Sequence, residues 1–166
     1  MLLYLGRTAD AVEQMNFART MDHAKAQAYL GKFLYYDGRM DEAERLFASA
    51  LRLNEEQQEP AVPVLAAFLY AAQGARHRID PWILTLRPPD SFDGDQAYWI
   101  GGVFALLGEK AASLAWLDRA VALGNHNYPW FRRDRNYDRL RGDPDYEGII
   151  ATVRREWERY GQLFGR

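Results

Sequence analysis

The side chains that could carry out chemistry are scattered along this sequence. The histidines, His23, His77 and His126, have no partner at the i+4 spacing that a metal site on a helix needs. Paired acids such as Asp93 and Asp95 occur, but none stands beside a nucleophile in a recognisable catalytic order. Because acids gather where helices begin, we interpret these pairs as helix caps. We therefore expect no catalytic residue, no metal site, no cofactor and no enzymatic activity.

The composition excludes further classes of function. The 166 residues include no cysteine, which removes thiol catalysis, disulfides, iron–sulfur clusters and thiolate zinc sites. The formal net charge is −2, so the chain has no basic surplus for binding nucleic acid through phosphates. The longest apolar stretch, from Ala61 to Ala72, is too short for a bilayer span of about 20 residues. Since the N-terminal residues also lack the basic start of a signal peptide, we expect a soluble cytoplasmic protein.

One segment near the C-terminus combines aromatic residues with arginines, as nucleic-acid sites do. The arginines alternate with aspartates: Arg132, Arg133, Arg135, Arg139 and Arg141 against Asp134, Asp138, Asp143 and Asp145. Five bases against four acids leave a net charge of +1. We expect an internal lattice of salt bridges here, and nucleic-acid binding is the less favoured alternative.

Four glycines recur at nearly constant spacing: Gly6, Gly38, Gly74 and Gly108, separated by 32, 36 and 34 residues. After Gly6, Gly38 and Gly108, small residues follow at five and twelve residues and a large apolar residue at nine. Before Gly38, Gly74 and Gly108, a small residue lies seven residues back. These offsets place the small and large residues on facing helix surfaces and predict a helix, a glycine turn and a second helix. The small residues allow the two helices to approach closely, and the glycine suits a helix end with positive φ.

At these positions the sequence resembles the tetratricopeptide repeat (TPR) family, whose units are helix–turn–helix hairpins of 34 residues. The second unit matches its signature most fully, with Gly31, Gly38, Ala43, Phe47 and Ala50. The fourth unit, from Gly94 to about Gly124, has Ser113 in place of the first alanine. The resemblance implies an all-α fold, a short right-handed solenoid of such hairpins with a C-terminal capping helix.

Two units depart from this pattern. In the third, Ile79 occupies the alanine position, and we expect a short helix capped by Asp80 and stopped by the Arg87-Pro88-Pro89 run. In the first, only five residues precede Gly6, so we expect the chain to be a fragment or a degraded end of a longer array.

The pattern changes after Gly124. Residues 1–124 are predicted to form the repeats, and residues 125–166 a loop and a capping helix that begins with Asp143 as N-cap and ends near Tyr160. The aromatic residues Tyr128, Trp130 and Phe131 are expected to cover the last repeat. Roughly residues 98–157 also resemble the C-terminal ends of bacterial multidomain signalling proteins, in which TPR arrays follow a serine/threonine kinase, a nucleotide cyclase or a winged-helix regulator.

The resemblance also implies where a partner binds, because the first helix of each TPR unit lines a concave groove. Carried over to this sequence, the inward positions include six residues that we predict to contact a partner: Lys25, Lys32, Tyr35, Tyr36, Phe68 and Tyr98. Aromatic residues at such spacing also serve as packing between repeats, and that alternative stays open. No inward position carries asparagine, so we do not expect the family's clamp for a C-terminal carboxylate.

The function predicted from these observations is a non-catalytic scaffold that binds a peptide or helical segment of another protein, or of its own parent protein. One alternative is the regulatory tail of a bacterial kinase, cyclase or transcription regulator. A less favoured alternative is an RNA-binding helical repeat or a small enzyme.

Overall fold

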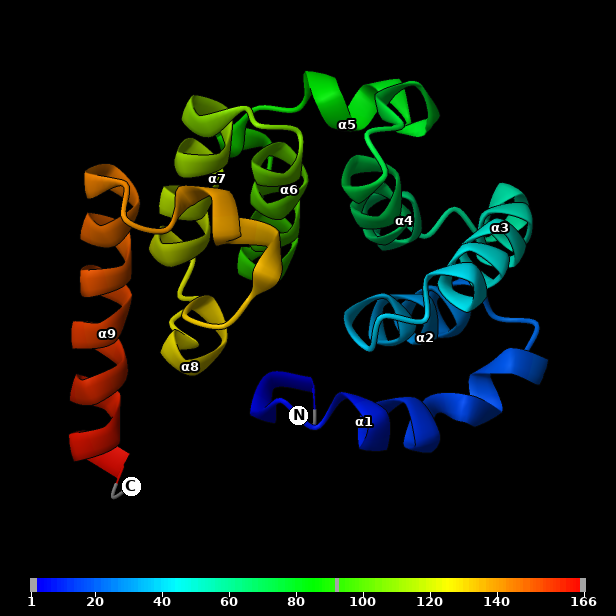
Figure 1. Cartoon of the computed structure of the whole chain (residues 1–166), viewed down its shortest axis with the longest axis horizontal. Helices are drawn as coiled ribbons and strands as arrows, with labels where there is room; N and C mark the ends of the chain where they lie inside the picture. Colours follow the sequence, from blue (N-terminus) through cyan, green and yellow to red (C-terminus); the bar gives the residue numbers. More distant parts are fainter. Residues whose placement is uncertain (1–2, 92, 165–166) are drawn as a thin grey trace. The chain divides into compact units, whose positions relative to one another are not determined.

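The computed structural model describes residues 3–91 and 93–164, and in that part of the chain every regular element is a helix. The all-α prediction is therefore confirmed. The chain forms two compact units, Met1–Leu84 (unit 1) and Thr85–Arg166 (unit 2). The helices follow one another as drawn in Figure 1: α1 (Thr8–Met15), α2 (Ala24–Tyr36), α3 (Met40–Gln57), α4 (Ala61–Ala72), α5 (Pro81–Thr85), α6 (Gly94–Leu106), α7 (Lys110–Ala122), α8 (Tyr128–Phe131) and α9 (Pro144–Phe164).

The predicted glycine turns are present and share one hydrogen-bond pattern. Gly6, Gly38, Gly74 and Gly108 all have positive φ, between 69° and 83°. At Gly38, Gly74, Gly108 and Gly124, the glycine N–H donates to the carbonyl three residues back and the next N–H donates to the carbonyl five back, at 2.8–3.1 Å. This pair of bonds is the Schellman motif, which satisfies the last carbonyls of a helix. The same device thus ends α2, α4, α6 and α7.

In unit 1, α2 and α3 pack as a hairpin around a contact between a small and a large residue. A Cβ added at Gly31 would lie 2.9 Å from the ring of Phe47, which is fully buried. Because real Cβ atoms do not approach so closely, the glycine is what lets the ring of α3 rest on the backbone of α2. The predicted role of the small and large positions is confirmed in this hairpin.

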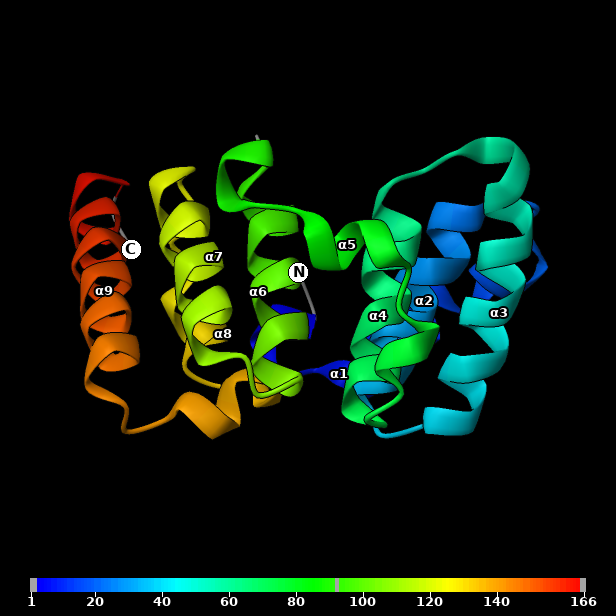
Figure 2. The same ribbon diagram turned by 90° about the horizontal axis from the view of Figure 1, so that it is seen from above.

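In unit 2, α6 and α7 form a second hairpin of the same kind, and α9 lies beside α7 (Figures 1 and 2). A Cβ at Gly101 would lie 2.8 Å from the hydroxyl of Tyr137 and 3.3 Å from the carbonyl oxygen of Ser113. The Ser113 hydroxyl, at the position where the repeat has alanine, donates to the carbonyl of Gly101 at 2.9 Å. The serine therefore joins the two helices by a hydrogen bond as well as by its small size.

Helix boundaries agree with the sequence where a capping residue was identified. Asp80 Oδ1 accepts from the backbone N–H of Trp82 at 3.3 Å, and the helix α5 that it starts is short, as expected. Asp143 Oδ1 accepts from the N–H groups of Asp145 and Tyr146, which places the N-cap of α9 as predicted. Helix α9 continues to Phe164, four residues beyond the expected end at Tyr160. The second helix of the first unit stops at Met15, and a 3-10 helix (Asn16–Thr20) follows it.

The two compact units divide after Leu84, whereas the sequence placed the main change after residue 124. The reason is visible in the packing within unit 2. The 3-10 helix Arg135–Leu140 packs on α6, and α9 packs on α7 and α8. The fourth repeat and the predicted cap therefore share one core. None of the helices in residues 3–91 and 93–164 is long and apolar enough to cross a bilayer.

Candidate functional site

Three of the residues predicted to contact a partner form an aromatic cluster in unit 1. The ring of Tyr35 in α2 stacks on Phe68 in α4, with centroids 6.2 Å apart and planes 21° from parallel. Tyr36 meets Tyr35 edge-on at 5.2 Å. Tyr35 and Phe68 are 2% and 1% exposed, whereas Tyr36 is half-buried. Tyr35 and Phe68 therefore hold α2 against α4, and Tyr36 is the member of this cluster that reaches solvent.

The two predicted lysines of α2 have different surroundings. Lys25 is partly exposed, with its Nζ 3.4 Å from Oε2 of Glu59. Lys32 is 3% exposed, and its Nζ lies 4.7 Å from the ring centroid of Tyr29 and 5.8 Å from that of Phe33. The aromatic faces compensate part of the cost of burying the Lys32 ammonium group. Of the two, only Lys25 is placed to meet a partner.

Tyr98, the predicted contact in α6, belongs to a buried cluster inside unit 2. It is 2% exposed and its hydroxyl donates to Oδ2 of Asp134 at 2.8 Å. Its ring lies 4.5 Å from Phe131 and 5.2 Å from Tyr137, centroid to centroid. The Tyr137 hydroxyl donates to the Tyr98 carbonyl at 2.6 Å. This face of α6 is thus covered by residues 131–137 of the same unit, and Tyr98 is removed from the set of partner contacts.

Two half-buried aromatic residues that the sequence analysis missed complete a stripe along α2. Lys25, Tyr29, Phe33 and Tyr36 are all half-buried and follow one another at intervals of four, four and three residues. Residues at these intervals lie on one side of a helix. We call these four residues the α2 stripe. The i, i+4 spacing of Tyr29 and Phe33 is visible in the sequence, but neither residue occupies an inward position of the TPR signature.

The arginines of the C-terminal segment mostly bind backbone carbonyls. Arg141 pairs with Asp138 at 2.7 Å and also donates to the carbonyls of Arg132 and Asp134. Arg133 and Arg139 donate to the carbonyls of Pro129 and Leu106. The expected salt bridge between interleaved residues is present at Arg141–Asp138, and Arg132 pairs with Glu147 of α9 at 3.6 Å. The contacts of Arg133 and Arg139 given above are instead hydrogen bonds to carbonyl oxygens, so a lattice of Arg–Asp pairs is not what these contacts form.

Burial governs the titration of the two tyrosines in this segment. Tyr146 is buried, which raises its pKa to about 12, and its hydroxyl donates to the Phe131 carbonyl at 3.3 Å. Burial also raises the pKa of the Tyr137 hydroxyl well above its usual value. Both side chains therefore stay neutral and serve as hydrogen-bond donors at any physiological pH.

Two of the histidines make local contacts with the backbone. Nδ1 of His23 accepts from the N–H of Ala26 and caps α2, and Nε2 of His126 lies 3.1 Å from the Val121 carbonyl. No set of three or more histidine, aspartate or glutamate side chains among the described residues is arranged to hold a metal ion.

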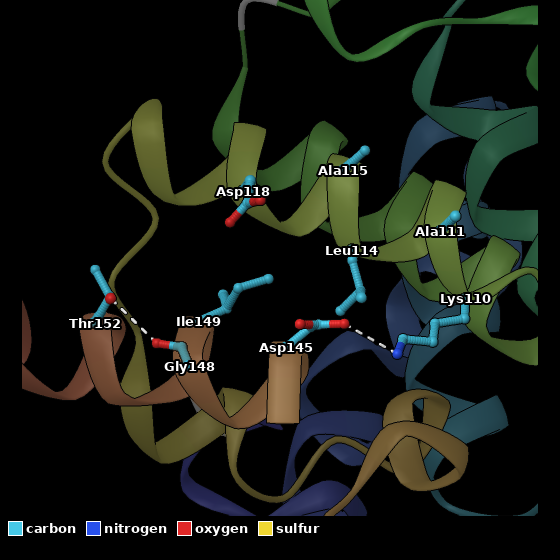
Figure 3. Close-up of a pocket in the computed structure, with 9 residues that line it drawn as sticks. All are labelled: Lys110, Ala111, Leu114, Ala115, Asp118, Asp145, Gly148, Ile149 and Thr152. Atoms are coloured by element: carbon cyan, nitrogen blue, oxygen red, sulfur yellow. Dashed lines mark hydrogen bonds and ion pairs between the residues drawn. The ribbon is translucent and has the colours of Figure 1, made fainter. Parts of the chain in front are cut away.

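A separate cavity of about 740 Å³ opens between α7 and α9 in unit 2 (Figure 3). It is lined by Lys110, Ala111, Leu114, Ala115, Asp118, Asp145, Gly148, Ile149 and Thr152. Neighbouring side chains partly desolvate the carboxyl group of Asp118 and raise its pKa. The lining carries two carboxylates, those of Asp118 and Asp145, and one base, Lys110, whose Nζ lies 3.0 Å from Oδ2 of Asp145. The exposed carboxylate of Asp118 can bind a cationic group.

Comparison of the chain with protein-family models, with curated proteins and with solved structures finds no match in any of the three.

Proposed function

We propose that this protein is a non-catalytic scaffold of TPR type that binds a peptide or helical segment of a partner protein. Support for the repeat assignment comes from the shared Schellman turns and from the close approach of Gly31 to Phe47 and of Gly101 to α7. These features are local to each hairpin and recur at the spacing at which the family's signature recurs. A cytoplasmic location and a partner within the same parent protein are compatible with this proposal.

The observation that carries the proposal is the α2 stripe. Three half-exposed aromatic side chains in line on a rigid helix present a large contact area whose ordering upon binding costs little conformational entropy. Tyr35 and Phe68, stacked behind the stripe, fix the position of Tyr36. Such a surface matches an extended segment or a helix with apolar residues at its own i, i+4 spacing.

Lys25 places a positive charge at one end of the α2 stripe, so the two ends of the stripe differ chemically. Its ion pair with Glu59 is partly exposed, and pairs of this kind contribute little to stability. An acidic group of the partner can therefore replace Glu59 at small cost. We propose a partner segment that carries apolar residues along its length and a carboxylate at the end that meets Lys25.

The test is quantitative capture of a partner by the tagged protein and its variants. Tyr36→Ala is expected to reduce the captured amount of a specific protein by at least about tenfold, since it removes one of the three aromatic contacts of the α2 stripe. It also loses the edge contact with Tyr35, worth about 1 kcal/mol. Ile150→Val, a core change in unit 2 with a similar cost in stability, is the matched control and is expected to leave capture unchanged.

Lys25→Glu is expected to weaken the same interaction in a salt-dependent manner. If Tyr36→Ala and Lys25→Glu capture as much of the partner as the unchanged protein does, the α2 stripe is not the binding surface.

A further inference from the structure

The cavity between α7 and α9 is a groove lined by small residues. Ala111 and Ala115 line it from α7, and Gly148 lines it from α9, while Leu114 and Ile149 point toward one another across its floor (Figure 3). A Cβ added at Gly148 would meet no atom within 4 Å. The groove therefore has room for side chains of another helix, in the way that the ridge of one helix fits between two others.

Asp118 stands in this groove without a partner. Its carboxylate makes no hydrogen bond and no ion pair with any residue in 3–91 or 93–164. At the other end of the groove, by contrast, Lys110 binds Asp143 at 2.6 Å and Asp145 at 3.0 Å. The lining residues carry one base and two acids, so the charge missing from the groove is positive. An occupant with a basic residue level with Asp118 would supply it.

Helix α9 itself carries a ridge with this chemistry, formed by Arg155, Arg159 and Leu163 at i, i+4 and i+8, in which Arg159 pairs with Glu156 at 2.6 Å. On a helix these residues continue the side that holds Gly148 and Thr152. Arg155 has no carboxylate partner among the described residues, and it donates instead to the Thr152 hydroxyl at 2.9 Å. Leu163 is 63% exposed.

These features are self-complementary when two copies are set antiparallel. The first half of this side of α9 is acidic and small, with Asp145 and Gly148, and Asp118 of α7 lies beside it. The second half is basic and ends in Leu163. A twofold axis near the middle of α9 brings the second half of each copy to the first half of the other, as an interface between identical surfaces requires.

We propose that a second copy of this chain occupies the groove between α7 and α9, with α9 packed antiparallel on α9 of its partner. The Arg155–Arg159–Leu163 ridge of each copy lies over Gly148 and the alanines of the other, and Arg155 pairs with Asp118 across the interface. This inference goes beyond the scaffold function and concerns residues of unit 2 alone, so the α2 stripe and the groove are tested independently.

Sedimentation equilibrium over a range of protein concentrations tests the proposal. The average mass of the unchanged protein is expected to rise from that of one chain toward that of two. Gly148→Leu fills the groove and is expected to weaken dimerisation by at least about tenfold. Gly161→Leu is the matched control, because it makes the same replacement in α9 at a position that also has free space around it. It is expected to dimerise as the unchanged protein does.

Exchanging the charges of Asp118 and Arg155 tests whether these two residues pair across the interface. Asp118→Arg and Arg155→Asp are each expected to weaken the dimer by about tenfold or more, and the double variant is expected to recover most of the loss. A single-chain mass at all concentrations overturns the proposal, and so does a dimer that Gly148→Leu leaves intact. A double variant that does not recover, or charge changes that alter thermal stability but not mass, overturns the antiparallel pairing.

Discussion

The hairpins α2/α3 and α6/α7 use the same turn and the same close approach at a glycine, but their inner helices meet different neighbours. The position that holds Ala28 in α2 holds Tyr98 in α6. In unit 2, Phe131 and Tyr137 pack on Tyr98, and Asp134 accepts from its hydroxyl. In unit 1, α2 keeps a side with three half-buried aromatic residues and Lys25.

The difference lies at two equivalent positions of the hairpins. Tyr29 and Phe33 of α2 are half-buried, whereas Trp99 and Val103, which occupy the same positions of α6, are buried. The segment that follows each hairpin also differs. After α7 the chain returns over α6, whereas after α3 it continues into α4.

The largest expected effect concerns what the two hairpins share. Phe47→Ala in unit 1 and Leu117→Ala at the equivalent position in unit 2 each remove a fully buried side chain. The variants are expected to lower the free energy of unfolding by about 2–5 kcal/mol, measured by urea denaturation. A loss below about 1 kcal/mol in either variant would show that its hairpin is not held together in the way described.

The close contact between Gly31 and the Phe47 ring can be tested with a more specific control. Gly31→Ala is expected to cost about 1 kcal/mol, because the new Cβ would lie 2.9 Å from the Phe47 ring and must push it aside. In the background of Phe47→Leu the ring edge is gone, and Gly31→Ala is expected to be neutral or stabilising. Equal costs in both backgrounds would contradict the close approach.

A further expected effect is a loss of stability at high pH. It concerns Tyr137, in the 3-10 helix that packs on α6, and Tyr146, whose ring stacks on Tyr137. The pKa of Tyr146 is raised to about 12 by burial, above the value near 10 of an unfolded tyrosine. Tyr146 therefore loses its proton at a lower pH in the unfolded state than in the folded state. Its contribution to stability is complete below pH 10 and is lost as the pH rises toward 12. The expected slope is about 1.4 kcal/mol per pH unit for this residue.

Urea unfolding at pH 8, 10 and 11 measures this slope. Tyr137, whose pKa is also raised by burial, adds to it in the same direction. Tyr146→Phe is expected to flatten the decline because it removes one of the two titrating groups. An unchanged slope in this variant would mean that the Tyr146 hydroxyl is solvated.

Tyr98→Phe directly tests the packing of residues 131–137 on α6. It removes the donor to Asp134, a carboxylate that is 1% exposed, and hydrogen bonds to charged groups are worth about 1.5–3 kcal/mol. We expect a loss of about 2 kcal/mol in the free energy of unfolding. Asp134→Asn in the same background is expected to recover part of it, since it removes the under-satisfied charge. A neutral Tyr98→Phe variant would show that the cover does not depend on this bond.

The smallest expected effect comes from exchanging Ser113 and Ala43, which occupy the same position in the two hairpins. Ser113→Ala loses the hydrogen bond to the Gly101 carbonyl and is expected to cost about 1 kcal/mol or less. Ala43→Ser in the α2/α3 hairpin is expected to be tolerated equally well, because its hydroxyl can donate to the corresponding carbonyl of Gly31. Thermal unfolding of both variants checks this equivalence, and a strongly destabilised Ala43→Ser would contradict it.

The fold was readable from the sequence where the signal is local. Positive φ at Gly38, Gly74 and Gly108 follows from glycine chemistry, and the caps Asp80 and Asp143 follow from side-chain hydrogen bonding to nearby N–H groups. Helix α9 runs beyond the expected end at Tyr160 because it continues through Gly161, a residue type that commonly follows a helix C-terminus.

The candidate site was readable only in part, because burial is a property of tertiary packing. The expectation that Phe131 covers the last repeat agrees with its ring lying 4.5 Å from that of Tyr98, but no sequence pattern marks Tyr98 as the residue it covers. Tyr35 and Phe68 face each other across a long stretch of chain. Lys25 and Tyr36 were identified from the repeat positions. The groove between α7 and α9 was missed, since its lining comes from two helices that no sequence motif connects.

Site-specific photo-crosslinking tests the central claim most directly, that the side of α2 is a partner surface. A benzophenone amino acid is placed at Tyr36 and, as a control, at the exposed Arg52 of α3, and covalent adducts are identified by mass spectrometry. The account predicts an adduct with one specific protein from Tyr36 and none with that protein from Arg52. Adducts of equal yield from both positions, or none from Tyr36 in a folded protein, would contradict it.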